Sequence, residues 1–150
     1  MAFVKMATYA AVVLAKGTAR PVTGVLSLTA EERRKRLLPW QTSEGETVYL
    51  ELPRGVVLQD EDVLHVPARD WVLTVAARPE PVLTVRASQP LLLLRAAYHL
   101  GNRHVPLQIT PEWLRLAADG VLADLLREMG LTVTEEMACF YPEMGAYHHH

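Results

Sequence analysis

Two prolines that enclose a single charged residue, in the stretch Arg78-Pro79-Glu80-Pro81, divide the sequence into two parts with different hydrophobic rhythms. A proline fixes its own backbone and restricts the residue before it, so residues 78–81 are predicted to form a short, stiff linker. A chain of 150 residues has room for one ordinary domain or two small ones. We therefore expect one domain over residues 1–77 and another over 82–141, followed by a flexible tail over 142–150 that ends in histidine.

The first part is dominated by short runs of β-branched and apolar residues, bounded by glycine and proline. The expected strands are residues 9–14, 21–28, 47–52, 56–58, 63–66 and 71–76. Short strands at this spacing are typical of a small β-barrel or β-sandwich, and we expect that architecture for residues 1–77.

The main run of charge lies within this part, from Thr29 to Arg36, where two acids precede four basic residues. Ser27 or Thr29 is placed to cap a short helical turn here. One interpretation of the run is a solvated face or an edge strand guarded by charge. The other is a binding surface made by Arg33–Arg36. A formal net charge of −2 argues against a protein that works by neutralising nucleic-acid phosphates.

The second part alternates strands with two helical patterns. Ser88 is expected to cap the first helix, Gly101 to end or kink it, and Asp119 to cap the second helix. The expected elements are a strand at 82–87, a helix at 90–100, strands at 107–109 and 113–116, a helix at 120–128 and a strand at 131–134 that continues weakly through 137–141. This β-α-β-β-α-β order is the split βαβ, ferredoxin-like arrangement. The whole chain is therefore expected to belong to the α+β class.

The sequence lacks the signatures of several enzyme classes. It contains no Gly-x-Ser-x-Gly, no phosphate-binding glycine-rich loop and no His-Glu-x-x-His. A single cysteine, Cys139, excludes an internal disulfide and a cysteine-based zinc cage. The most hydrophobic run, Leu91–Leu94, is too short to span a bilayer. We expect a cytoplasmic protein that binds neither nucleic acid nor membrane.

Two histidines lie close together, at His99 and His104, whereas His65 is expected to be a partly buried strand residue. Five residues along a helix correspond to about 140° around its axis, so His99 and His104 are poorly spaced to chelate one metal. On its own, His104 is either a hydrogen-bonded structural residue or half of a metal site that a two-fold axis completes with a second copy.

The sequence closes with His148, His149 and His150. These residues either complete the coordination sphere of that metal site or are the remnant of an affinity tag. Imidazole ligands suit nickel, copper and zinc alike, so the residue type does not select the ion.

The stretch around these two internal histidines resembles a known family. The residues Tyr98-His99-Leu100-Gly101-Asn102-Arg103-His104-Val105-Pro106-Leu107-Gln108-Ile109 are similar to the signature of the UreE-type urease accessory proteins, the nickel metallochaperones. The resemblance covers nearly the whole chain and is strongest over residues 95–134. The other stretches that carry it are Glu32–Arg36, Leu52–Val56, Asp119, Leu131–Thr134 and Pro142–Tyr147.

The resemblance implies a homodimeric carrier that brings Ni²⁺ to apo-urease, together with accessory proteins that include a GTPase, and that catalyses no reaction. It implies a peptide-binding role for residues 1–77 and a ferredoxin-like, metal-binding and dimerisation role for residues 82–141. His104 of each subunit would share one nickel ion, and His148, His149 and His150 would add coordination. Zn²⁺ or Cu²⁺ is expected to substitute in vitro.

This chain departs from the family pattern just before the second helix. Some members carry extra histidines there, but Leu116–Gly120 contains none, so we expect one high-affinity nickel ion per dimer. Two other hypotheses stay open. The chain is either an adaptor of the urease activation complex whose metal binding is incidental, or, less in keeping with its acidic balance, a nucleic-acid binder that uses Arg33–Arg36.

Overall fold

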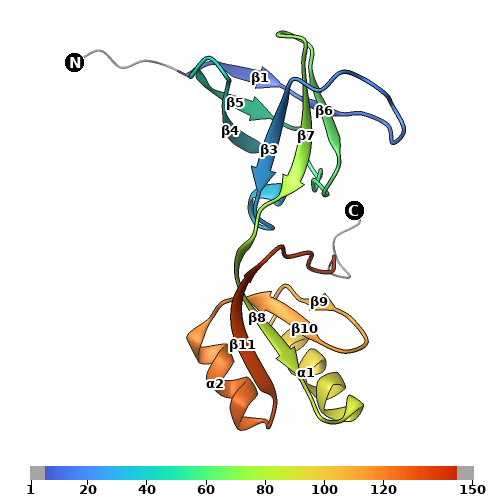
Figure 1. The fold of residues 1–150 in the computed structure, drawn as a ribbon, viewed down its shortest axis with the longest axis vertical. Coiled ribbons are helices and arrows are strands. Elements are labelled where there is room, and N and C mark those ends of the chain that lie inside the picture. Colours follow the sequence, from blue (N-terminus) through green and yellow to red (C-terminus); the bar gives the residue numbers. More distant parts are fainter. Residues whose placement is uncertain (1–5, 145–150) are drawn as a thin grey trace, which may run out of the picture. The chain divides into compact units, whose positions relative to one another are not determined.

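The computed structural model describes residues 6–144. The chain divides between Ala77 and Arg78 into two compact units, called unit 1 and unit 2 below (Figure 1). The chain contains mixed sheets in unit 1, an antiparallel sheet in unit 2 and few helices, so the fold belongs to the α+β class. Residues 145–150, which include the three closing histidines of the expected tail, lie outside the described residues.

The connection between the units is shorter than the expected linker at 78–81. Strand β7 (Trp71–Ala77) ends just before Arg78, and strand β8 (Glu80–Arg86) begins at Glu80. Pro81 therefore lies inside β8. A proline is tolerated near the start of a strand, and its carbonyl still accepts a hydrogen bond from the Ala118 amide at 3.1 Å.

Unit 1 contains two sheets among the described residues. Besides β7, its strands are β1 (Thr8–Ala10), β2 (Val12–Val13), β3 (Gly24–Leu28), β4 (Leu37–Gln41), β5 (Thr47–Glu51) and β6 (Val63–Val66). One sheet has the order β1-β5-β4 and the other the order β2-β6-β7-β3. Each contains one parallel pair, β1 with β5 and β3 with β7. The described strands do not close into a barrel, which corrects that part of the prediction.

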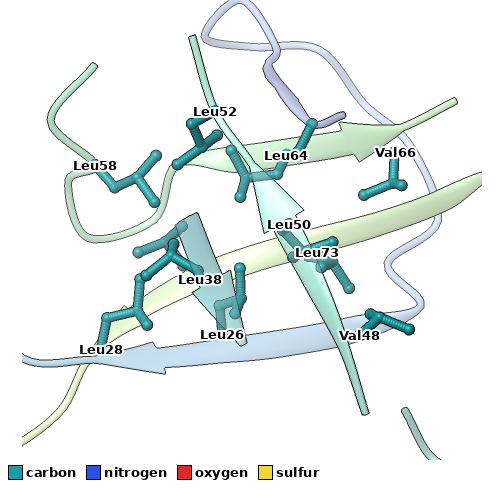
Figure 2. Packing of buried hydrophobic residues seen from close by; sticks show 12 residues of the cluster. Leu26, Leu28, Leu38, Val48, Leu50, Leu52, Leu58, Leu64, Val66 and Leu73 are labelled. Atoms are coloured by element: carbon teal, nitrogen blue, oxygen red, sulfur yellow. The ribbon is translucent and has the colours of Figure 1, made fainter. Parts of the chain in front are cut away.

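Side chains from both sheets of unit 1 meet in one core (Figure 2). Leu38 and Leu50 come from the first sheet, and Leu64 and Leu73 come from the second. All four are at most 1% exposed. Because side chains alternate along a strand, each strand buries one face and leaves the other to solvent or to a covering segment.

Unit 1 also carries a half-buried aromatic cluster next to this core. The rings of Trp40 and Trp71 meet edge to face with centroids 5.0 Å apart. The guanidinium of Arg69 lies 4.4 Å from the centroid of the Trp71 ring. Hydrogen bonds to the Tyr9 hydroxyl and to Glu46 raise the pKa of Arg69, so its charge persists over this cluster.

Two features of unit 1 differ from the predicted strands. Strand β4 is absent from the predicted strands. It contains Pro39 and stands at the edge of its sheet, where a proline costs no ladder hydrogen bond. Residues 56–58 form no strand. Leu58 is nevertheless buried, and its amide donates to the Arg33 carbonyl at 2.8 Å.

The charge run forms a structured turn, the 3₁₀ helix η1 (Glu32–Arg34). The Thr29 amide donates to the Glu32 carboxylate at 2.9 Å, and the Glu32 amide donates to the Thr29 hydroxyl at 3.3 Å. This reciprocal pair is a capping box. Arg33 is only 4% exposed and donates to the Leu28 carbonyl at 3.1 Å. One of the four basic residues is therefore used in folding and is not available to a phosphate.

The described residues of unit 2 form one antiparallel sheet of the order β11-β8-β10-β9. Its elements after β8 are α1 (Pro90–Asn102), β9 (Gln108–Ile109), β10 (Leu114–Ala117), α2 (Gly120–Glu128) and β11 (Thr132–Ala138). The core packs residues of both helices against one face of the sheet, Leu100 from α1 and Leu126 from α2 meeting Leu83 of β8. The element order is the β-α-β-β-α-β order expected from the sequence.

The two helices of unit 2 begin differently. Asp119 caps α2 as expected, accepting a hydrogen bond from the Leu122 amide at 3.0 Å. The prediction that Ser88 caps α1 is wrong, because Gln89 occupies the N-cap position of this helix and makes no side-chain capping bond. Pro90 at the first position, with its backbone already in a helical φ, starts α1 instead. Within residues 6–144, neither helix is long and apolar enough to cross a membrane.

Candidate metal centre

The end of α1 holds His104 in an uncommon backbone conformation. The helix runs through Gly101, which was expected to end or kink it, and stops at Asn102. The His104 amide donates to the Gly101 carbonyl at 3.0 Å, and the Val105 amide donates to the Leu100 carbonyl at 3.1 Å. This pair of bonds is a Schellman motif, whose left-handed residue is usually glycine. Here that residue is His104, with φ of +58°.

The Schellman turn is fixed by side chains before and after His104 that pack into the core of unit 2. Leu100 is fully buried, and Val105 packs against the same unit 2 core. Leu107, three residues after His104, is 6% exposed. A left-handed backbone costs a residue other than glycine on the order of 1 kcal/mol. Such a cost persists where the surroundings fix the conformation, so His104 is held in place by its neighbours.

The imidazole of His104 is exposed on this turn. Among residues 6–144 no partner hydrogen-bonds its side chain. The interpretation of His104 as a hydrogen-bonded structural residue therefore has no support in the described part of the chain. An exposed imidazole on a fixed backbone is a suitable ligand for a divalent metal ion.

The other internal histidines have local explanations. His99 lies on the last turn of α1, exposed, with its ring edge to face with Tyr98 at a centroid distance of 5.4 Å. His65 lies in β6, as expected, with its side chain 17% exposed and its Nε2 3.3 Å from an Asp70 carboxylate oxygen. No three His, Cys, Asp or Glu residues gather into a metal-binding group within the described residues.

The last described residues of the chain lie beside the His104 turn. The Glu143 amide donates to the Leu107 carbonyl at 2.7 Å. The closing histidines, five to seven residues further along, lie outside the described residues. The structure thus fixes one candidate ligand, His104, and the starting point of the segment that carries the others. It also reveals the left-handed φ of His104, which the sequence pattern does not predict because glycine is the usual residue at such a position and the glycine of this stretch is Gly101.

Comparisons with known proteins cover both units. The family model for the UreE urease accessory protein, N-terminal domain, matches residues 10–77. The model for its C-terminal domain matches residues 80–150. The urease accessory protein UreE of Thermosynechococcus vestitus is 58% identical over 125 residues, 83% of this chain and 87% of the relative. That of Nostoc sp. is 53% identical over 129 residues, 86% of this chain and 88% of the relative.

A relative from Burkholderia shows the same likeness. The urease accessory protein UreE of Burkholderia lata is 51% identical over 122 residues, 81% of this chain and 58% of the relative. A two-unit α+β chain with these matches is an accessory protein and not an enzyme. The chain belongs to the UreE urease accessory protein family, and this membership gives it a role in urease maturation.

Proposed function

We propose that this chain binds Ni²⁺ and delivers it to apo-urease while the urease active site is assembled. It acts as a homodimer that holds one ion between His104 of two subunits. The observation that carries the proposal is the exposed imidazole of His104, which the end of α1 fixes in place and which no described residue hydrogen-bonds. One imidazole alone holds a divalent ion weakly, so the site needs a second copy to supply another ligand.

The exposed side of α1 supports the assignment of a second copy of this chain as the partner. Leu91, Leu94 and Tyr98 follow one another at helical spacing and are 53%, 67% and 66% exposed. Apolar side chains gathered along one helix are typical of a surface that another protein covers. The turn that closes the same helix carries His104, so a symmetric contact through this stripe brings two such histidines toward one axis.

The closing histidines add ligands in this proposal. From Glu143 to His148 there are five residues, which span at most about 18 Å when extended. Glu143 is bonded to Leu107, three residues from His104. His148, His149 and His150 are therefore within reach of the metal that His104 binds.

Unit 2 is proposed to be the ferredoxin-like, metal-binding and dimerising part of the protein. Its β-α-β-β-α-β order and its antiparallel sheet of the order β11-β8-β10-β9 support that classification. Both α1 and His104 lie in this unit.

Unit 1 is proposed to bind a peptide segment of urease or of one of its accessory proteins, which include a GTPase. Strand β3 stands at the edge of its sheet, and Val25 on this strand is 56% exposed. Val22, just before the strand, is 52% exposed. An exposed edge with apolar side chains accepts an added strand from a partner.

Calorimetric titration with Ni²⁺ tests the metal site. The wild type is expected to bind one tight ion per two chains, and His104→Gly, which keeps the left-handed turn, is expected to lose more than about tenfold in affinity. His99→Ala is the matched control, because His99 is exposed on the same helix end and is not proposed as a ligand. Undiminished tight binding by His104→Gly would overturn the role of His104.

The adaptor hypothesis is distinguished in cells that need this protein for urease activation. It predicts that His104→Gly supports full urease activity at limiting nickel, whereas a variant with charged residues at the β3 edge, Val22→Glu with Val25→Glu, does not. The carrier proposal predicts loss of activity with His104→Gly and its recovery when nickel is supplied in excess.

A further inference from the structure

Gly101 is a glycine that the fold of its own chain does not require. It lies within α1, one residue before the end of the helix, and its φ is not positive. Apart from its two chain neighbours and the backbone of its own helix, no atom lies within 4 Å of the place that a Cβ atom would occupy. Alanine would therefore fit at this position, and alanine stabilises a helix relative to glycine.

Most of the other described glycines have a reason within the chain. A Cβ atom at Gly24 would lie 2.7 Å from the Trp40 ring. Gly120 also has open space around it, but it lies at the first position of the other helix, α2. The remaining four have a positive φ, which favours glycine: Gly17, Gly45, Gly55 and Gly130. The missing side chain of Gly101 therefore needs an explanation from outside the chain.

Gly101 continues the exposed stripe of α1 toward the candidate ligand. Leu94 and Gly101 are seven residues apart, which is about two turns of a helix, and Tyr98 lies about one turn before Gly101. Leu94 and Tyr98 are 67% and 66% exposed, and Gly101 is exposed as well. The His104 amide donates to the Gly101 carbonyl at 3.0 Å. The stripe thus loses its side chain at the residue that is bonded to the His104 turn.

This stripe is suited to contact with a second copy of itself. Leu91, Leu94, Tyr98 and Gly101 carry no charge. In a two-fold contact the same surface of each copy meets the other, so an uncharged stripe meets no like charge. The distance between two packed helices depends on the side chains at their contact. A glycine in the stripe therefore allows the closest approach of two α1 helices.

We infer that Gly101 is a positioning residue: two copies of α1 come closest at this glycine, and their two His104 side chains can then share one ion. The inference rests on the proposed function, because it explains how the bridged site is formed. An imidazole nitrogen bonds a divalent ion at about 2.1 Å, so two nitrogens on one ion lie within about 4 Å of each other. By symmetry, a methyl group added at Gly101 is added to both copies, and the two groups together hold the helices apart.

The close approach is tested first without metal, by the dimer dissociation constant of the full chain in a sedimentation dilution series. Gly101→Ala is expected to raise this constant about tenfold, and the larger Gly101→Leu is expected to raise it further. Gly120→Ala is the matched control, because it adds the same methyl group to the exposed glycine of α2. A dimer as tight in Gly101→Leu as in the wild type would overturn the inference.

Unfolding of the same variants separates a loss of contact from a loss of fold. The urea midpoint of unit 2, followed by helical circular dichroism, is expected to stay the same or to rise in Gly101→Ala, because alanine favours the helix. A lower midpoint would also overturn the inference, since the chain itself would then require the glycine.

The positioning role is tested by calorimetric titration with Ni²⁺. Gly101→Ala is expected to weaken binding about tenfold, and Gly120→Ala is expected to leave it unchanged. If Gly101→Leu binds Ni²⁺ as tightly as the wild type while His104→Gly does not, the positioning role is wrong and the proposed function stands. Absence of Ni²⁺ binding by the wild type would instead overturn the proposed function. The metal-free dimer would then still decide whether Gly101 is the point of closest approach.

Discussion

The Val105 amide donates a hydrogen bond to the Leu100 carbonyl at 3.1 Å, and this bond closes the end of α1 around His104. His104, the residue before Val105, therefore adopts a left-handed backbone, with φ of +58°. Glycine adopts that conformation without a steric cost, and histidine does not. The chain therefore carries an imidazole at a position where folding alone favours glycine.

This conflict predicts opposite effects of one substitution on stability and on metal binding. His104→Gly is expected to stabilise unit 2 by about 0.5–1 kcal/mol, and His104→Ala is expected to give no such gain, because alanine keeps the steric cost. Urea unfolding followed by helical circular dichroism is the measurement, since α1 and α2 both lie in unit 2. Equal stability of the glycine and alanine variants would contradict the backbone argument.

A charge on the exposed side of α1 is expected to break the proposed dimer. Leu94 is 67% exposed in the single chain, so Leu94→Glu is compatible with folding but buries a carboxylate in a two-fold contact. We expect dimer dissociation to become easier by at least about tenfold, measured by native mass and sedimentation. Val121→Glu is the control, because Val121 is 76% exposed on the other helix. A dimer that survives Leu94→Glu would place the contact elsewhere.

The cap of α2 gives a local stability prediction. Asp119→Ala removes the acceptor for the Leu122 amide, a bond of 3.0 Å, and is expected to cost about 1 kcal/mol. Asp124→Ala, on the exposed side of the same helix, removes only a weak 3.8 Å pair with Arg127. It is expected to change stability by less than about 0.5 kcal/mol. Similar losses in the two variants would argue against the cap.

Unit 1 has its own steric test at Gly24. A Cβ atom at this position would lie 2.7 Å from the Trp40 ring, which is itself packed against Trp71. Gly24→Ala is therefore expected to destabilise unit 1 by about 1–3 kcal/mol, measured by tryptophan fluorescence during unfolding. Val25→Ala, at the exposed neighbouring position, is the control. A small effect at Gly24 would mean that Trp40 moves aside at little cost.

Much of unit 2 follows from local pattern. The helical spacing of apolar residues and the Asp119 cap predict α2, and the strands around Thr110 predict the β9-β10 pair. Spacing alone separates His99 from His104 as ligands. The role of His104 as a metal ligand stays a prediction until a metal is measured.

The errors lie where tertiary context decides. Glycine is a common residue at the end of a helix, but α1 continues one residue past Gly101. The turn that ends it is set by Leu100 and Val105, which both pack into the core of unit 2. Strand β4 is missing from the prediction. Its Pro39 is compatible with a strand only because β4 lies at the edge of its sheet, and local sequence does not show which strands lie at an edge. The contact between Gln108 and Tyr141 joins residues 33 apart in sequence. The periodicity of hydrophobic residues cannot predict a contact between residues so far apart.

The last described residues also set a boundary for sequence change in this chain. Phe140 is buried, whereas Glu143 and Met144, which follow it, are exposed. Insertions or deletions after Met144 leave every buried residue of the described chain in place. In the proposed carrier, sequence change that alters the number of closing histidines therefore falls on a different stretch of the gene from the one that encodes the buried residues of the described chain.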